Sequence, residues 1–275
     1  MPDLRSLVAS ADLPPGTLID RTVLGRVAEP LLWRADGPAE PAGWERLPAG
    51  PPGTGPHPVL LGRDSRGVAV EDDLLPGGAD GRGRGRGDGS AAGGGAPDAF
   101  AVLAARWSQQ AAREPDGGAV LRPYGRRWPG PARPAGRSAA EPRRPDAVAV
   151  SVARSLLTRG LLREPRLALV PVRHSSGIPA AIGWTGALAH EADTAPHHTV
   201  LRSWEERFGT RVVALEPDAL HLSVPSPPRD VEEALPQAAE HYAFCPSVVR
   251  QGAGTLARYA EKWLVGRDLW SFWWD

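Results

Sequence analysis

Hydrophobic side chains in the second half of the chain recur at spacings typical of helices and strands. Val148, Val152 and Leu156 lie four positions apart within residues 148–162, which predicts an amphipathic helix. The apolar run over residues 166–172 follows and is typical of a buried strand. Helix and strand therefore alternate along this part of the chain.

A second amphipathic helix is predicted after Thr194, a favourable N-cap residue, and Gly209 is a natural residue to end it. The runs 210–215 and 219–224 come next, and the Glu-Pro-Asp between them predicts a β-hairpin. The apolar face of the helix consists of Val200, Leu201, Trp204 and Phe208.

Two more helices and a terminal strand are predicted after the hairpin. Asp230 caps the first helix, Pro236 should kink that helix or delay its start, and Thr255 opens the second. Residues 270–275 are predicted as the strand. The pattern as a whole predicts an α+β fold, with a partly antiparallel sheet and packed helices.

The first half is much richer in glycine and proline: of 32 Gly and 30 Pro in the chain, 44 lie within residues 1–146. Short β-rich runs at 18–24, 29–33 and 58–61 and a helix capped by Asp98 interrupt loops rich in these residues. Four regions are expected: a short-strand region (1–75) that packs on the main domain, a flexible Gly/Arg-rich linker (76–97), a helix with a Pro/Arg-rich loop (98–146), and a compact α+β domain (147–275).

Charge and cysteine content exclude several classes of function. The 32 basic and 32 acidic residues balance, so no overall basic field favours nucleic acid or an anionic membrane. The only lysine is Lys262, which excludes a Walker loop, and the only cysteine is Cys245, which excludes an internal disulfide or a Cys-rich zinc site. No cofactor is expected. With no signal region and no long apolar stretch, a cytoplasmic protein is predicted.

Three motifs in the second half are distinctive together. They are Val-Leu-Arg-Ser-Trp-Glu-Glu-Arg-Phe-Gly over 200–209, Glu-His-Tyr-Ala-Phe-Cys-Pro over 240–246, and Trp-Ser-Phe-Trp-Trp-Asp over 270–275. With Gly-Trp at 183–184, they make roughly residues 165–275 resemble a bacterial family, domain of unknown function 4253. The resemblance implies membership of that family and no particular activity. The chain departs from the family pattern at Pro236 and at Ser247.

Cys245 is the candidate nucleophile. His241 stands one helical turn before it and would accept the thiol proton, and Glu240 would orient the imidazole, so a hydrolase or transferase is one hypothesis. The other interpretation places Cys245 on an apolar stripe with Val231, Leu235, Ala238 and Tyr242, as a small buried hydrophobe near a helix end. The second interpretation is favoured.

Other polar groups favour ordinary structural roles. His190, Asp193 and His197 contain ligand types that a metal site would use, but their spacing is typical of a polar loop that enters a helix, so no metal is predicted. His174 and Ser175 are adjacent without a nucleophile elbow, and a serine at a helix start is more often a cap.

The aromatic terminus is the most distinctive feature. Alternation in a terminal strand sends Phe272 and Trp274 to one face and Trp273 to the other, and the second face is either covered or available for binding. The carboxylates of Asp275 would receive Arg202 or Arg207. The leading hypothesis is a non-enzymatic ligand- or protein-binding module of regulatory or immunity-like type. Its candidate binding residues are Trp184, Trp204, Glu205, Trp270, Trp273 and Asp275.

Overall fold

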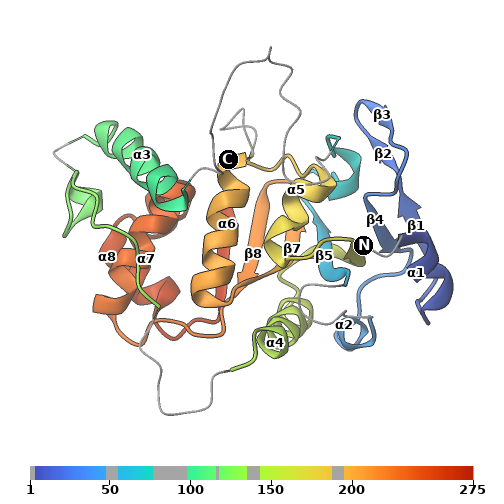
Figure 1. The fold of residues 1–275 in the computed structure, drawn as a ribbon. Helices are drawn as coiled ribbons and strands as arrows, with labels where there is room; N and C mark the ends of the chain where they lie inside the picture. The colour runs from blue at the N-terminus through green and yellow to red at the C-terminus, as the bar shows by residue number, and fades with distance from the viewer. Residues whose placement is uncertain are drawn as a thin grey trace.

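The computed structural model of the chain describes residues 4–47, 55–76, 98–115, 118–134, 143–187 and 195–274. Within them, seven strands form one sheet in the order β1-β4-β6-β5-β7-β8-β9, and β2 and β3 form a separate two-stranded hairpin. All pairings in the large sheet are antiparallel except that of β5 with β7. The fold is therefore α+β, with helices packed on a mostly antiparallel sheet (Figure 1).

The strands come from both halves of the chain. The first half supplies β1 (Gly16–Ile19), β2 (Arg21–Thr22), β3 (Gly25–Arg26), β4 (Leu32–Ala35) and β5 (His57–Arg63). The second half supplies β6 (Arg163–Val170), β7 (Arg211–Glu216), β8 (Ala219–Ser223) and β9 (Leu269–Trp273).

Strand β5 occupies the slot between β6 and β7. It pairs antiparallel with β6, where Val59 lies opposite Ala168, and parallel with β7, where Leu60 lies opposite Ala214. Strands β6 and β7 are consecutive in sequence but do not pair with each other. The sheet of the second half is therefore complete only because a strand from the first half stands inside it.

Two hydrophobic cores lie on the two faces of the sheet. Alternate residues of β6 point to opposite faces, so Ala168 and Val170 join one core and Leu167 and Leu169 the other. The first core packs on α3 (Ala99–Ala112), α6 (Ala195–Phe208), α7 (Val231–Phe244) and α8 (Leu256–Tyr259). The second packs on α1 (Leu4–Ser10), α2 (Gly43–Arg46) and α4 (Pro145–Thr158). Figure 1 shows α6 crossing in front of the central strands, with α3, α7 and α8 gathered at one end.

The predicted helix ends and the hairpin are confirmed. The side chains of Asp98, Asp230 and Thr255 accept hydrogen bonds from the amides of Phe100, Glu233 and Arg258, as N-caps do. Gly209 follows α6 with φ +71°, in the left-handed region that glycine adopts without strain. Strands β7 and β8 pair antiparallel around the predicted turn.

Some predicted boundaries were wrong. The strand expected over 18–24 ends at Ile19, because the chain then turns into the β2–β3 hairpin, and the strand expected over 29–33 lies at Leu32–Ala35. Pro236 does not delay the start of α7, since the helix begins at Val231 and continues to Phe244 with the proline inside it. The extent of the helix opened by Thr255 is confirmed: it runs from Leu256 to Tyr259 and goes on as a π-helical turn, Ala260–Leu264.

Several sequence predictions lie outside the described residues. They concern the linker beyond residue 76, part of the loop after residue 134, and His190, Asp193, Thr194 and Asp275. In the part of the chain that is described, no helix combines the length and the apolar character needed to cross a membrane.

Candidate functional site

The proposed nucleophile and its two partners lie inside the first core. Cys245 and Glu240 have no exposed surface, and His241 is 1% exposed. All three come from α7 and its C-terminal end, where the amide of Cys245 donates to the carbonyl of His241. A substrate would have no route to the thiol in this conformation.

Glu240 is hydrogen-bonded to groups other than His241. Arg207 of α6 makes two hydrogen bonds to its carboxylate, at 2.8 and 2.7 Å, and the indole N–H of Trp204 donates to it at 2.6 Å. The amide of Ala132 completes the set at 2.7 Å. We call these four residues the Glu240 cluster. It satisfies a fully buried carboxylate with a partly buried guanidinium, as an interior charge requires.

His241 and Cys245 also bond elsewhere. The Nδ1 atom of His241 is 3.0 Å from the hydroxyl of Tyr259, and the thiol of Cys245 donates to the carbonyl of Trp273 at 2.9 Å. Burial lowers the pKa of His241 to about 3, so the imidazole is neutral and a weak proton acceptor at neutral pH. The three groups thus do not form the proton relay that nucleophilic catalysis needs.

Most rings of the aromatic terminus also lie in the core. Trp184, Trp204 and Trp270 are almost fully buried, and Trp204 stacks on Phe272 with ring centroids 5.4 Å apart. Phe272 and Trp274 face the core while Trp273 on the other face is partly exposed, which confirms the predicted alternation. Arg202 pairs with Glu206, and Arg207 belongs to the Glu240 cluster; the predicted contact of these arginines with Asp275 lies outside the described residues.

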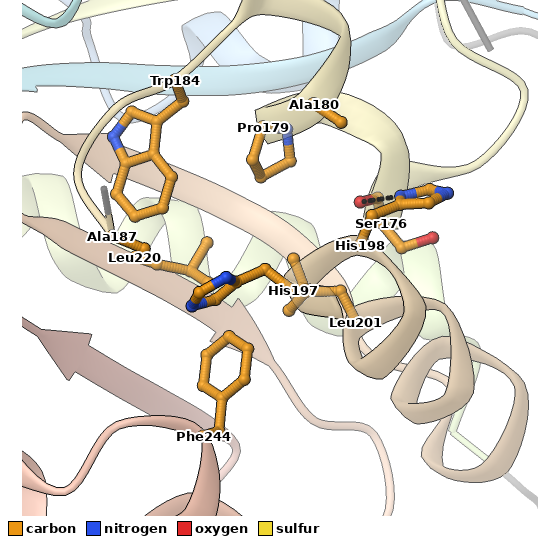
Figure 2. A pocket seen from close by; sticks show the side chains of 10 residues that line it. All are labelled: Ser176, Pro179, Ala180, Trp184, Ala187, His197, His198, Leu201, Leu220 and Phe244. Atoms are coloured by element: carbon orange, nitrogen blue, oxygen red, sulfur yellow. Dashed lines mark hydrogen bonds between the residues drawn. The ribbon is translucent and has the colours of Figure 1, made fainter. Parts of the chain in front are cut away.

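A small apolar cavity lies beside His197, with room of about 20 Å³, enough for a single water molecule (Figure 2). Trp184, His197 and Phe244 converge on it, and His198 turns away to bond the carbonyl of Ser176 at 3.3 Å. Among the described residues, no three His, Cys, Asp or Glu side chains gather as metal ligands would.

A much larger cavity, about 370 Å³, opens where the two halves of the chain meet. This volume is in the range of small-molecule sites. We call it the junction cavity. The segment before β5 forms one wall, α4 a second, and the ends of β6 and β7 with α6 the third. Its lining residues are Trp44, Glu45, Leu47, Pro56, His57, Pro58, Asp146, Ala149, Val150, Arg173, His174, Ser175, Glu205, Arg211 and Val212.

Glu205, one of the expected binding residues, is held at this cavity. Its carboxylate accepts the amide of Ser176 at 2.9 Å and is 3.3 Å from the guanidinium of Arg211. The Nδ1 atom of His174 lies 3.9 Å away. Arg211 also pairs with Asp146 of α4 at 3.0 Å, so opposite charges from three elements meet at one edge of the cavity.

His57 and Arg173 occupy the same cavity. The Nε2–H of His57 donates to the carbonyl of Arg173 at 3.3 Å, which leaves Nδ1 with its lone pair. Burial lowers the pKa of His57, and Glu205, Arg211 and Asp146 are close enough to contribute smaller effects. His57 is therefore neutral at neutral pH and both accepts and donates hydrogen bonds.

A Glu-His-Ser row lies across three strands on the sheet face opposite α6 and α7. His221 of β8 is 2.9 Å from the hydroxyl of Ser271 in β9 and 3.3 Å from the carboxylate of Glu216 in β7. The order is that of a hydrolase triad, but none of the three lines the junction cavity or the small one. The row is best explained as cross-strand hydrogen bonding.

Sequence analysis missed His57, Asp146, Arg173 and Arg211. They lie in four separate segments that only the fold brings together, so no local spacing indicates them. The usable signal was indirect: Arg173 directly follows the strand predicted over 166–172, and Arg211 lies at the start of the one predicted over 210–215. Polar side chains at strand ends often line sites.

Comparison with known families finds a match for the C-terminal part of the chain. Residues 166–275 match the model of a domain family described as Domain of unknown function (DUF4253). No curated protein and no solved structure matches the chain. The match covers β6 from Arg166 onward, β7 to β9 and one side of the junction cavity, and it leaves β5 and α4 outside.

Proposed function

We propose that this chain, whose residues 166–275 belong to the DUF4253 family, is a bacterial cytoplasmic binding module that takes a small molecule into the junction cavity. One observation carries the proposal. The cavity combines a ligand-sized volume with a concentration of polar and charged groups beside an apolar wall.

The lining has the mixed character that small-molecule sites show. Trp44, Leu47 and Val150 supply apolar surface, while His57, Arg173 and Glu205 supply hydrogen-bonding groups. Apolar area provides the free energy of binding and a few fixed polar groups provide orientation. Catalysis through Cys245 is a less favoured alternative, because Cys245, His241 and Glu240 are enclosed and bonded to other groups.

Filling the cavity tests the proposal. Val150 is half-buried on α4 and lines the cavity, so Val150→Trp should occupy the space at little cost to folding. A metabolite library is screened by thermal shift against the full chain and against the variant. Compounds that stabilise the full chain should lose at least tenfold in affinity in Val150→Trp.

The matched control is Leu161→Trp, which adds the same ring at an exposed position just after α4 and outside the cavity. It should bind the same compounds as the full chain. Binding that survives Val150→Trp unchanged, or a library in which no compound binds the full chain, would overturn the proposal.

A further inference from the structure

Resting on the proposed function, we infer that the ligand of the junction cavity is a small organic acid with one carboxylate and an apolar body. Arg173 binds the carboxylate, and Trp44, Leu47 and Val150 contact the apolar part. His57 accepts a hydrogen bond from a hydroxyl or N–H group on the ligand.

The charge argument begins with the two arginines. The guanidinium of Arg211 is already engaged, since it pairs with Asp146 and with Glu205. Within the described residues, Arg173 has no carboxylate partner, although its backbone carbonyl is bonded to His57. Arg173 is therefore the cavity's available cation, and a guanidinium binds a carboxylate through two parallel hydrogen bonds.

The carboxylates in the cavity limit the charge of the ligand. Three carboxylates line the cavity: Asp146 and Glu205 share Arg211, and Glu45 pairs with Arg154 outside the lining. A second negative charge on the ligand, as in a phosphate monoester or a dicarboxylate, would approach these groups and be repelled. A single carboxylate bound to Arg173 adds one negative charge to this lining, whereas a phosphate monoester or a dicarboxylate adds about two.

His57 adds a directional preference. Its Nε2–H is used by the carbonyl of Arg173, so the ring is fixed and Nδ1 remains an acceptor. Because burial keeps this ring neutral, it offers no positive charge to a second anion. The lone pair of Nδ1 instead favours a hydrogen-bond donor on the ligand. A hydroxyl or N–H on the ligand body satisfies it.

The apolar wall sets the shape of the ligand. Trp44 and Leu47 are 6% exposed each, and their side chains form a rigid surface beside the half-buried Val150. An aromatic or branched aliphatic body gains from burial against such a wall. A short, fully polar acid would leave this surface uncovered.

The experiment compares matched ligands that differ only in charge. Aromatic and branched-chain acids, each paired with its neutral amide and its amine, are titrated into the full chain by calorimetry, with inorganic phosphate as an ionic control. Acids should bind roughly tenfold to a hundredfold tighter than their amides, the ratio expected for a hydrogen bond to a charged group. Phosphate and the amines should bind weakly.

Two variants separate the inference from the function on which it rests. Arg173→Gln should remove the preference for the acid and leave amide binding in place, and Arg202→Gln, an exposed pair with Glu206, should change neither. Equal binding of acids and amides that Val150→Trp abolishes would overturn the carboxylate assignment and keep the cavity as a site. Failure of every acid, amide and amine to bind would overturn both.

Discussion

Two glutamates on neighbouring helices have contrasting surroundings. Glu240 on α7 has no exposed surface and is bonded to Arg207, Trp204 and the amide of Ala132. Glu205 on α6 is 10% exposed and faces the junction cavity. A buried carboxylate that is hydrogen-bonded only to other protein groups holds its helix against the neighbouring elements. A carboxylate at an open cavity that holds charges of both signs can interact with a ligand.

The contrast separates reactive residue types from reactive environments. Cys245, His241 and Glu240 look reactive in the sequence, but burial removes access to the first and lowers the pKa of the second. His57 and Arg173 form no recognisable motif, yet they share a cavity with Glu205. In this protein, solvent access and neighbouring groups determine which side chains can react or bind. Four predictions test this conclusion and the packing on which it depends.

The largest expected effect is on the reactivity of Cys245, the single thiol of the chain. Because this side chain is fully buried, its alkylation requires opening of the core, and the native rate should be at least a thousandfold lower than the rate in urea. Iodoacetamide labelling followed by mass spectrometry measures both rates, with a free cysteine peptide as the reference. A native rate close to that of the peptide would revive the cysteine-enzyme hypothesis.

Removing the buried carboxylate should be the most damaging substitution. Glu240→Ala leaves the guanidinium of Arg207 and the indole N–H of Trp204 without their acceptor, and should lower the free energy of unfolding by about 3–5 kcal/mol. Urea unfolding measures the loss. Glu206→Ala, which removes an exposed helical pair with Arg202, should cost less than about 0.5 kcal/mol. If Glu240→Ala lowered the free energy of unfolding as little as the control does, Glu240 would not hold α7 to its neighbouring elements.

The docking of the first half on the second depends on a glycine. Gly183 has φ +71°, its carbonyl accepts the amide of Leu75 at 2.8 Å, and a Cβ there would stand 1.7 Å from the carbonyl oxygen of Leu75. Gly160 has φ +60° with open space around it. Gly160→Ala should cost about 1–2 kcal/mol from backbone strain alone.

Gly183→Ala should cost at least about 1–3 kcal/mol more than Gly160→Ala, because the clash adds overpacking to the same strain. Thermal or urea unfolding of both variants gives the difference. Equal losses would show that the segment around Leu75 is readily displaced from the second half.

The smallest expected effect is a dependence of the free energy of unfolding on pH. The pKa of His241 is about 3 in the folded state against an ordinary value of 6.5, so the unfolded state binds the proton more readily. Stability is full above about pH 6.5 and should fall by about 1.4 kcal/mol per pH unit as the pH drops toward the folded pKa. His57, whose pKa is also lowered, adds to this slope in the same direction.

His241→Phe isolates the contribution of the buried ring. Urea unfolding at pH 7, 6 and 5 should show a shallower slope in the variant than in the parent chain. Parallel slopes in the two proteins would mean that His241 is protonated in the folded state and therefore accessible to water.

Sequence reasoning was reliable where the signal is local. Caps at Asp98, Asp230 and Thr255, the hairpin of β7 and β8, and the facing of Phe272 all depend on contacts within a few positions. Within the candidate site, Glu205 was identified but its neighbours were not. His57 and Arg173 meet only because β5 stands beside β6, a pairing between segments about a hundred residues apart that leaves no periodic trace.

The slot that β5 fills also sets the order in which the molecule can assemble. Strands β6 and β7 do not hydrogen-bond to each other. The sheet is therefore complete only after residues 57–63 have come between these two later segments of the chain. Such non-local pairing raises the contact order. The chain must lose conformational entropy to close the long loop before the strand contacts form, and this slows folding. A fragment limited to residues 166–275 would expose the facing edges of two strands, and it should aggregate or recruit a strand from another chain. Residues 166–275 should therefore not fold as an independent unit.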